Sequence, residues 1–161
     1  MDIEKLVNSN LVKLGRAVDM LWLSFGKSVI ITTHKGTRQV NEYALHVQCP
    51  WRFTKDNAII LGVKDIYDPL DPALDLDSEW NWDEFDRDIS KQSVFEANSK
   101  IINEDLLPLT INQVIQTECG DLRIEFNKNV VFELFITGIR KYEYWRFIDF
   151  NTREHTVVFE D

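Results

Sequence analysis

Apolar and polar positions alternate most regularly between Tyr43 and Phe53, where every odd-numbered residue is apolar or aromatic. From His46 to Arg52 the even-numbered residues are His, Gln, Pro and Arg. A period of two is typical of a strand with one buried face. Pro50 lies on the polar side and cannot donate a hydrogen bond to a neighbouring strand. We therefore predict one core strand over 43–53 that lies at a sheet edge, or is bulged, at Pro50.

The rest of the first half also has strand patterns. Apolar runs predict strands over 11–14, 18–25, 29–33 and 58–63, with turns at Gly26, at 34–36 and at 54–57. The strand over 43–53 and the strand over 58–63 then form a hairpin. Residues 2–8 precede these strands and fit one or two helical turns, with Ile3, Leu6 and Val7 on one side.

The last third of the chain predicts an antiparallel meander that begins at 111–117. Two further strands flank the triplet 127–129, which suits a three-residue loop with Asn129 in the left-handed conformation. This loop sets Arg123 opposite Glu133 and aligns the apolar faces of the two strands. The apolar pairs are Leu122 with Leu134, Ile124 with Phe132, and Phe126 with Val130. Two final strands are expected over 142–150 and 155–159.

The segment from Asp65 to Asp88 differs from the rest, because ten of its 24 residues are acidic. We expect an exposed loop over about 65–82, followed by a helix over about 83–104 that Ser78 or Asp83 caps. An apolar stripe supports the helix; it consists of Phe85, Ile89, Val94, Ala97, Ile101 and Ile102.

Together these patterns predict an α+β fold, mostly antiparallel β-sheet, with one principal α-helix packed on it. The length of 161 residues suits a single domain over 1–161. A hydrophobic content of 44%, with ten Phe and five Trp, indicates a folded chain with a real core.

The formal net charge of −9 narrows the classes of partner. A surface this negative repels nucleic acid and anionic lipid and attracts basic partners or cations. The N-terminal residues lack a basic region followed by an apolar run, and no stretch approaches the length of a membrane span, about 20 apolar residues. We expect a cytoplasmic protein that binds neither nucleic acid nor membrane; the sequence leaves its oligomeric state open.

Candidate catalytic groups are few. Cys49 and Cys119 lie inside or beside apolar strands, where a buried free thiol is expected, and neither suits a nucleophile. His46 is three residues from Cys49, but residues three apart on a strand point to opposite faces. The histidines lie in separate segments without the spacing of a zinc site, and Gly26-Lys27-Ser28 lacks the first glycine of a P-loop. We therefore expect no enzymatic activity and no cofactor.

The acidic segment offers two alternative binding sites. A partner-binding surface would combine exposed tryptophans with acids that steer a basic protein; its residues are Asp75, Asp77, Glu79, Trp80, Trp82 and Asp83. The same aromatics could instead pack into the core. A calcium loop is the second alternative, and its candidate ligands are Asp75, Asp77, Glu79, Asp83 and Asp86. Position 6 of that loop is Trp80 where glycine is required, so the match to a calcium loop is incomplete.

The stretches Ala44 to Arg52, Asp121 to Phe126 and Glu143 to Arg146 together resemble a class of small, uncharacterised bacterial proteins. Some proteins of this type resemble immunity proteins of contact-dependent or polymorphic toxin systems. The resemblance covers roughly 14–159 and implies a bacterial cytoplasmic protein that neutralises a basic toxin by binding it. Its motifs are structural, so it assigns no functional residue. A small-ligand or calcium-binding module is the alternative function.

Overall fold

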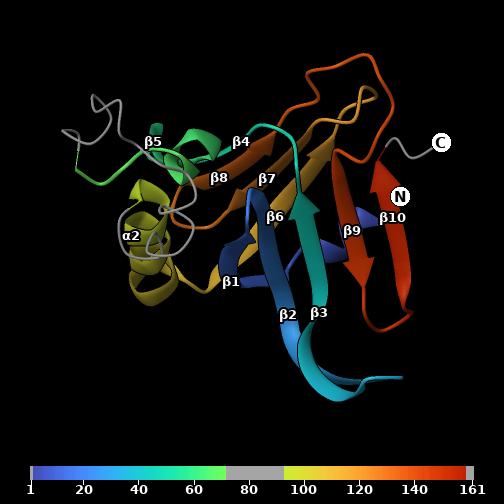
Figure 1. The fold of residues 1–161 in the computed structure, drawn as a ribbon. Helices are drawn as coiled ribbons and strands as arrows, with labels where there is room; N and C mark the ends of the chain where they lie inside the picture. The colour runs from blue at the N-terminus through green and yellow to red at the C-terminus, as the bar shows by residue number, and fades with distance from the viewer. Residues whose placement is uncertain (1, 72–92, 159–161) are drawn as a thin grey trace.

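The computed structural model describes residues 2–71 and 93–158, which form a ten-stranded antiparallel sheet with one principal helix (Figure 1). The strand order is β10-β9-β3-β2-β1-β6-β7-β8-β4-β5. The first half of the sheet contains β1 (Asn10–Ala17), β2 (Met20–Thr33), β3 (Gly36–Val47), β9 (Trp145–Asp149) and β10 (Glu154–Val158). The second half contains β4 (Trp51–Lys55), β5 (Ala58–Gly62), β6 (Leu109–Gln116), β7 (Leu122–Phe126) and β8 (Val130–Leu134). The predicted α+β class with mostly antiparallel strands is confirmed.

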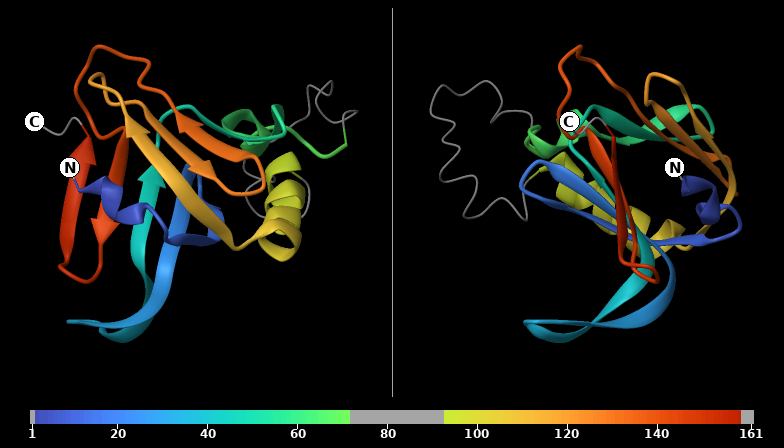
Figure 2. Two further views of the ribbon diagram at one scale, coloured as in Figure 1. Left: turned by 180° about the vertical axis from the view of Figure 1, so that it is seen from behind. Right: turned by 90° about the vertical axis from the view of Figure 1, so that its right-hand side faces the viewer.

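The two halves of the sheet curve around a common core (Figure 2). In the sheet they meet only where Asn10 and Leu11 of β1 pair with Thr110 and Leu109 of β6. One hydrophobic cluster contains buried residues of both halves, Leu45 and Phe132 among them. The short 3-10 helices η1 (Ile3–Leu6) and η2 (Val63–Ile66) add to this cluster; η1 confirms the helical turn predicted near the N-terminus.

The predicted continuous strand over 43–53 is wrong, although its predicted face is buried. Strand β3 ends at Val47 and β4 begins at Trp51, so the chain leaves the first half of the sheet and enters the second half through Gln48, Cys49 and Pro50. Val47, Cys49 and Trp51 are nevertheless all buried in the same core. Pro50 cannot donate to a ladder, which favours a strand end here, and its carbonyl accepts a hydrogen bond from the Phe135 amide at 2.9 Å.

The boundaries predicted in the first third also need correction. Val18 belongs to the turn between β1 and β2; its side chain is 74% exposed and its φ is +57°. Gly26 does not end a strand. It lies at a bulge in β2, with φ +80°, and the ladder between β2 and β3 shifts its register between Phe25 and Ser28. The turn after Thr33 and the turn after Lys55 occur where the sequence predicts them.

Beyond the bulge, β2 and β3 continue as a two-stranded ribbon that we call the arm, residues 27–41. Within the described chain, its strands pair only with each other, and Figure 1 shows them projecting from the body. A bulge bends and twists the strand that carries it, and the Lys27 amide donates to the Glu42 carboxylate at 2.8 Å on the opposite strand. The bulge therefore marks where the arm leaves the sheet.

The predicted register of the hairpin between β7 and β8 is confirmed in its main pairs. Leu122 lies opposite Leu134, Ile124 opposite Phe132, and Arg123 opposite Glu133. Asn129 has φ +56°, in the left-handed region that the three-residue loop requires.

The helix begins later than predicted. Ser93 is extended and caps α2 (Val94–Ile101), because its hydroxyl accepts a hydrogen bond from the Glu96 amide at 3.2 Å. A π-helical turn, η5 (Ile102–Leu106), continues it. The predicted part over 83–92, with Phe85, Ile89 and the caps Ser78 and Asp83, lies outside the described residues.

The predicted apolar stripe of the helix is only partly right in its described part, where Ile102 is buried as predicted. Phe95 and Ser99 are buried, whereas Ile101 is 56% exposed. Phe95 packs edge-on against Trp51, with ring centroids 6.1 Å apart. This contact fixes the face that α2 turns toward the sheet.

Candidate protein-binding site

The binding residues that the sequence predicts lie outside the described residues. This applies to the partner-binding set Asp75, Asp77, Glu79, Trp80, Trp82 and Asp83, and to the alternative calcium set, which adds Asp86. Both sites, and the question of whether Trp80 and Trp82 pack into the core, stay predictions. Within 2–71 and 93–158, no group of three or more His, Cys, Asp or Glu side chains could hold a metal ion.

The cysteines have different environments. Both are free; Cys49 is buried, as expected, but Cys119 is exposed, so its predicted burial is wrong. Cys119 lies in the turn between β6 and β7. In this turn the Asp121 amide donates to the Thr117 hydroxyl, and the Cys119 thiol donates to the Asp121 carboxylate. Burial raises the pKa of the Cys49 thiol to about 12, which keeps it protonated at neutral pH.

His46 does not form a pair with Cys49. It lies on β3 between the cross-strand neighbours Trp22 and Arg146, while Cys49 lies past the end of the strand in the core. Burial lowers the pKa of His46, and the charge of Arg146 lowers it further. His46 is therefore neutral at physiological pH.

A groove between β5 and α2 forms an apolar hollow on the described surface. It has a volume of about 420 Å³, within the range of ligand-binding clefts. Its apolar lining consists of Ile59 and Ile60 of β5, Ile101 of α2, and Ile102 and Leu106 of η5. Ile59 is 64% exposed and Ile101 is 56% exposed, so the two side chains present apolar surface to solvent on opposite walls.

Hydrogen bonds fix the two walls of the groove relative to each other. The Asn98 side-chain amide donates to the Ile60 carbonyl at 3.3 Å and joins α2 to β5. On the other side of the helix, Asn103 bonds both backbone groups of Leu14: its Oδ1 accepts from the Leu14 amide at 3.0 Å and its Nδ2 donates to the Leu14 carbonyl at 2.9 Å. The helix is thus held between two strands, and the groove has a defined shape.

Charged side chains stand at the rim of the groove. Lys55 lines the groove and is paired with Asp56 at 2.6 Å. Asp105 lines the groove and forms no ion pair with the described part of the chain. An exposed apolar wall beside an unpaired carboxylate suits a ligand that is apolar and cationic together.

A second hollow, of about 560 Å³, lies over β7 and β8 and is polar. Arg123 at its edge donates to Glu133 at 2.7 Å and to Glu125 at 2.8 Å, and Arg52 reaches the other oxygen of Glu133 at 2.9 Å. Burial tends to raise the pKa of Glu133, but the hydrogen bonds from Arg52 and Arg123 outweigh it and hold this pKa below its usual value. The charges are already paired, so this network stabilises the strands.

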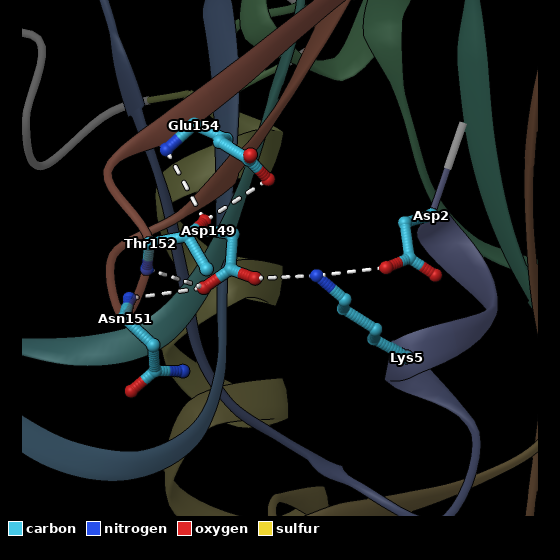
Figure 3. Close-up of polar contacts among 6 residues, drawn as sticks. All are labelled: Asp2, Lys5, Asp149, Asn151, Thr152 and Glu154. Carbon is cyan, nitrogen blue, oxygen red and sulfur yellow. Dashed lines mark hydrogen bonds and ion pairs between the residues drawn. The ribbon is translucent and has the colours of Figure 1, made fainter.

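A polar cluster joins the N-terminal helix η1 to the end of β9 (Figure 3). Asp149 is 4% exposed and accepts a hydrogen bond from Lys5 Nζ at 2.9 Å. It also accepts from the backbone amides of Asn151 and Thr152, at 2.9 and 3.4 Å. Lys5 is shared with Asp2, 2.8 Å away. Every oxygen of Asp149 is therefore occupied, and the cluster fastens η1 to the sheet.

Sequence reasoning missed the groove because its residues look like core residues. Ile59, Ile60 and Leu61 form an apolar run on β5, and only Leu61 is buried. One sequence signal could have indicated the groove: this run is apolar on both faces of a short strand, so one apolar face can lack a covering layer. The structure shows that β5 is the last strand in the sheet order.

None of the described helices is both long and apolar enough to cross a membrane. Comparisons with protein-family models, with curated proteins and with solved structures found no match to this chain.

Proposed function

We propose that this chain is a non-enzymatic protein-binding module of the bacterial cytoplasm that neutralises a basic partner, in the manner of the immunity proteins that its sequence resembles. The observation that carries the proposal is the groove between β5 and α2, with exposed Ile59 and Ile101 on its walls and Asp105 at its rim. The partner inserts an apolar side chain between the two isoleucines and places a Lys or Arg beside Asp105.

Apolar burial supports this mode of binding. Exposed isoleucines on facing walls lose contact with water when a side chain enters between them, and such burial stabilises a complex by about 25 cal/mol per Å². The hydrogen bond from Asn98 to Ile60 already holds the walls in place, so binding requires little ordering of this surface.

Charge supports the choice of a basic partner. The net charge of −9 attracts a cationic protein over long distances. Close to the groove, Asp105 has no basic partner among the described residues, whereas Lys55 is held by Asp56. Within the described chain, the Asp105 carboxylate is therefore available to an incoming cation, while Lys55, which also lines the groove, is paired with Asp56.

The proposal is tested first by capturing partners from a lysate of the source organism at low and at moderate salt, with identification by mass spectrometry. The affinity of the identified protein is then measured by calorimetry for the wild type and for the double variant Ile59→Thr, Ile101→Gln. We expect a basic protein whose dissociation constant rises at least about tenfold in the double variant. Asp105→Asn should weaken binding mainly at low salt.

Ile139→Thr is the matched control, because Ile139 is fully exposed in the loop between β8 and β9, outside the groove. Both sets of positions are exposed, so the variants should keep the wild-type melting temperature. A partner that binds the double variant and the wild type equally well would show that the groove is not the binding site. If no basic protein is retained at low salt, the proposed function is wrong.

A further inference from the structure

The arm, residues 27–41, takes no part in the groove and leaves the body at a different end (Figure 1). Its hydrogen bonds within the described chain join its own two strands or hold its base: Thr32 lies 3.4 Å from Thr37, and Asn41 donates to the Gly26 carbonyl at 3.1 Å. A ribbon of two strands is at best marginally stable alone. Contacts with another surface would therefore stabilise the arm as an ordered element.

Among the described residues, nothing pairs with the outer edge of either strand of the arm. Strand β1 pairs with β2 only as far as Phe25, and β9 pairs with β3 only from Tyr43. In an antiparallel ribbon, every second residue of each strand directs its N–H and C=O groups to the outer edge. These groups form a template for a further strand.

The two edges differ in chemistry. Strand β3 carries Arg38 in its exposed part, and such a charge discourages pairing. Strand β2 presents Ser28-Val29-Ile30-Ile31-Thr32-Thr33, six residues without charge, proline or glycine and rich in β-branched side chains. This composition is the signature of a strand that pairs edge to edge. Ile30 at its centre is 74% exposed.

We propose that the β2 edge of the arm pairs antiparallel with the same edge of a second copy of this chain. The two-fold axis lies beside Ile30, so that the arms form a continuous four-stranded sheet in the order β3-β2-β2-β3. The isoleucines of the two copies then cover each other on one face. A self-complementary patch of this kind produces a closed dimer.

The charge distribution favours this geometry. The arm contains Lys27, Lys35 and Arg38 and no Asp or Glu, whereas the whole chain has a net charge of −9. Antiparallel pairing directs Lys35, at the tip of each arm, toward the body of the other copy, and the chain outside the arm has an excess of acidic residues.

The size of the contact sets the expected strength. Six residues of edge pairing bury less than the roughly 1,200 Å² of a standard stable interface, so the dimer is weak and forms with rising concentration. Analytical ultracentrifugation of the full chain, from low to high micromolar concentration, measures this equilibrium.

The decisive variants are Ile30→Lys and Gln39→Lys. Ile30 and Gln39 are directly opposite each other on the two strands of the arm and are both exposed. Lys at position 30 places like charges across the dimer seam, whereas Lys at position 39 adds the same charge one strand away. We expect Ile30→Lys to raise the dissociation constant at least about tenfold, equivalent to about 1.4 kcal/mol, and Gln39→Lys to change it much less.

Cysteine cross-linking tests the geometry independently. In a Cys119→Ser background, Ile30→Cys should form a disulfide-linked dimer on mild oxidation and Gln39→Cys should not, since only position 30 lies at the seam. A wild-type chain that stays monomeric at the highest concentration would overturn the proposal, and so would equal effects of the two Lys variants. A monomer whose arm binds nucleic acid or an acidic protein would equally overturn it. The groove variants leave the arm intact, so this result is independent of the proposed function.

Discussion

At the scale of single residues, Asp149 shows how one buried carboxylate fastens two distant parts of the chain. Burial alone would raise its pKa, but hydrogen bonds from Lys5, Asn151 and Thr152 outweigh burial and lower this pKa below its usual value. The charged carboxylate of Asp149 is therefore more stable in the folded state than in the unfolded state. Neither the long separation between Lys5 and Asp149 nor the burial of Asp149 follows from local sequence patterns.

The lowered pKa predicts a specific dependence on pH. A carboxyl group whose pKa is depressed in the folded state contributes stability above its unfolded pKa, near 4, and loses that contribution as pH falls through the folded pKa. We expect Asp149→Asn to lower the free energy of unfolding by about 1–3 kcal/mol at pH 7. The difference from wild type should shrink as pH falls below about 4.

Urea unfolding of both proteins between neutral and acidic pH measures this difference. Asp2→Asn is the control, because Asp2 contacts the same Lys5 but its side chain is 67% exposed; its effect should be small at every pH. A difference between Asp149→Asn and wild type that stays constant through the acid range would show that the charge of Asp149 does not stabilise the fold.

At the scale of elements, η5 replaces a missing strand. Strand β1 pairs with β6 only at Asn10 and Leu11, so further along β1 the backbone of Leu14 meets the helix. There the Asn103 side chain accepts from the Leu14 amide and donates to the Leu14 carbonyl, as the backbone of a neighbouring strand would. It also donates to the Ser99 carbonyl at 2.9 Å. The π-helical turn brings this amide to the strand.

Asn103→Ala should therefore leave both backbone groups of Leu14 without a partner on that side. We expect a loss of about 1–3 kcal/mol in the free energy of unfolding, because unmade hydrogen bonds of partly buried groups are costly. Asn98→Ala removes a single bond, to the Ile60 carbonyl, and should cost less. Hydrogen exchange of the Leu14 amide provides a direct test; exchange as slow in Asn103→Ala as in wild type would contradict this role.

The elements also show what the sequence could and could not predict. The hairpin of β7 and β8 was predictable, because loop length, alternation and the pair Arg123 with Glu133 all specify one register. The break between β3 and β4 was not, because the alternation of buried residues continues through Cys49 while the strand itself ends. Burial follows position in the core, and hydrogen bonding follows the neighbouring strands, which are known only from the tertiary fold.

The arm and the groove were hidden for a related reason. The apolar runs from Val29 to Ile31 and from Ile59 to Leu61 both have the pattern of buried core strands. They are partly exposed because no further described strand pairs with their outer edges. Phe95 was missed in the opposite way: it packs on Trp51, although the periodic stripe favours Ile101. Candidate sites in this protein thus arise where sheet pairing stops.

At the scale of the whole molecule, two sheet halves share one core through several long-range connections. Within the sheet they touch only at the start of β1, but the chain between β3 and β4 passes directly from one half to the other. The Trp145 indole of the first half also donates to the Gly120 carbonyl, beside β7 of the second half, at 2.9 Å. Since buried residues of both halves belong to one cluster, neither half has a complete core of its own.

Unfolding should therefore be a single cooperative transition. Val47 in the first half and Val130 in the second half are both fully buried, so Val47→Ala and Val130→Ala form a matched pair that should each cost about 1–3 kcal/mol. Far-ultraviolet circular dichroism and the fluorescence of the buried tryptophans, Trp145 in β9 and Trp51 in β4, report on both halves. Each variant should move both signals together, because losing core contacts in one half removes the surface on which the other half packs. Two separate transitions, or transitions by circular dichroism and by fluorescence that do not coincide, would mean that the halves fold independently and that the shared core contributes little to their coupling.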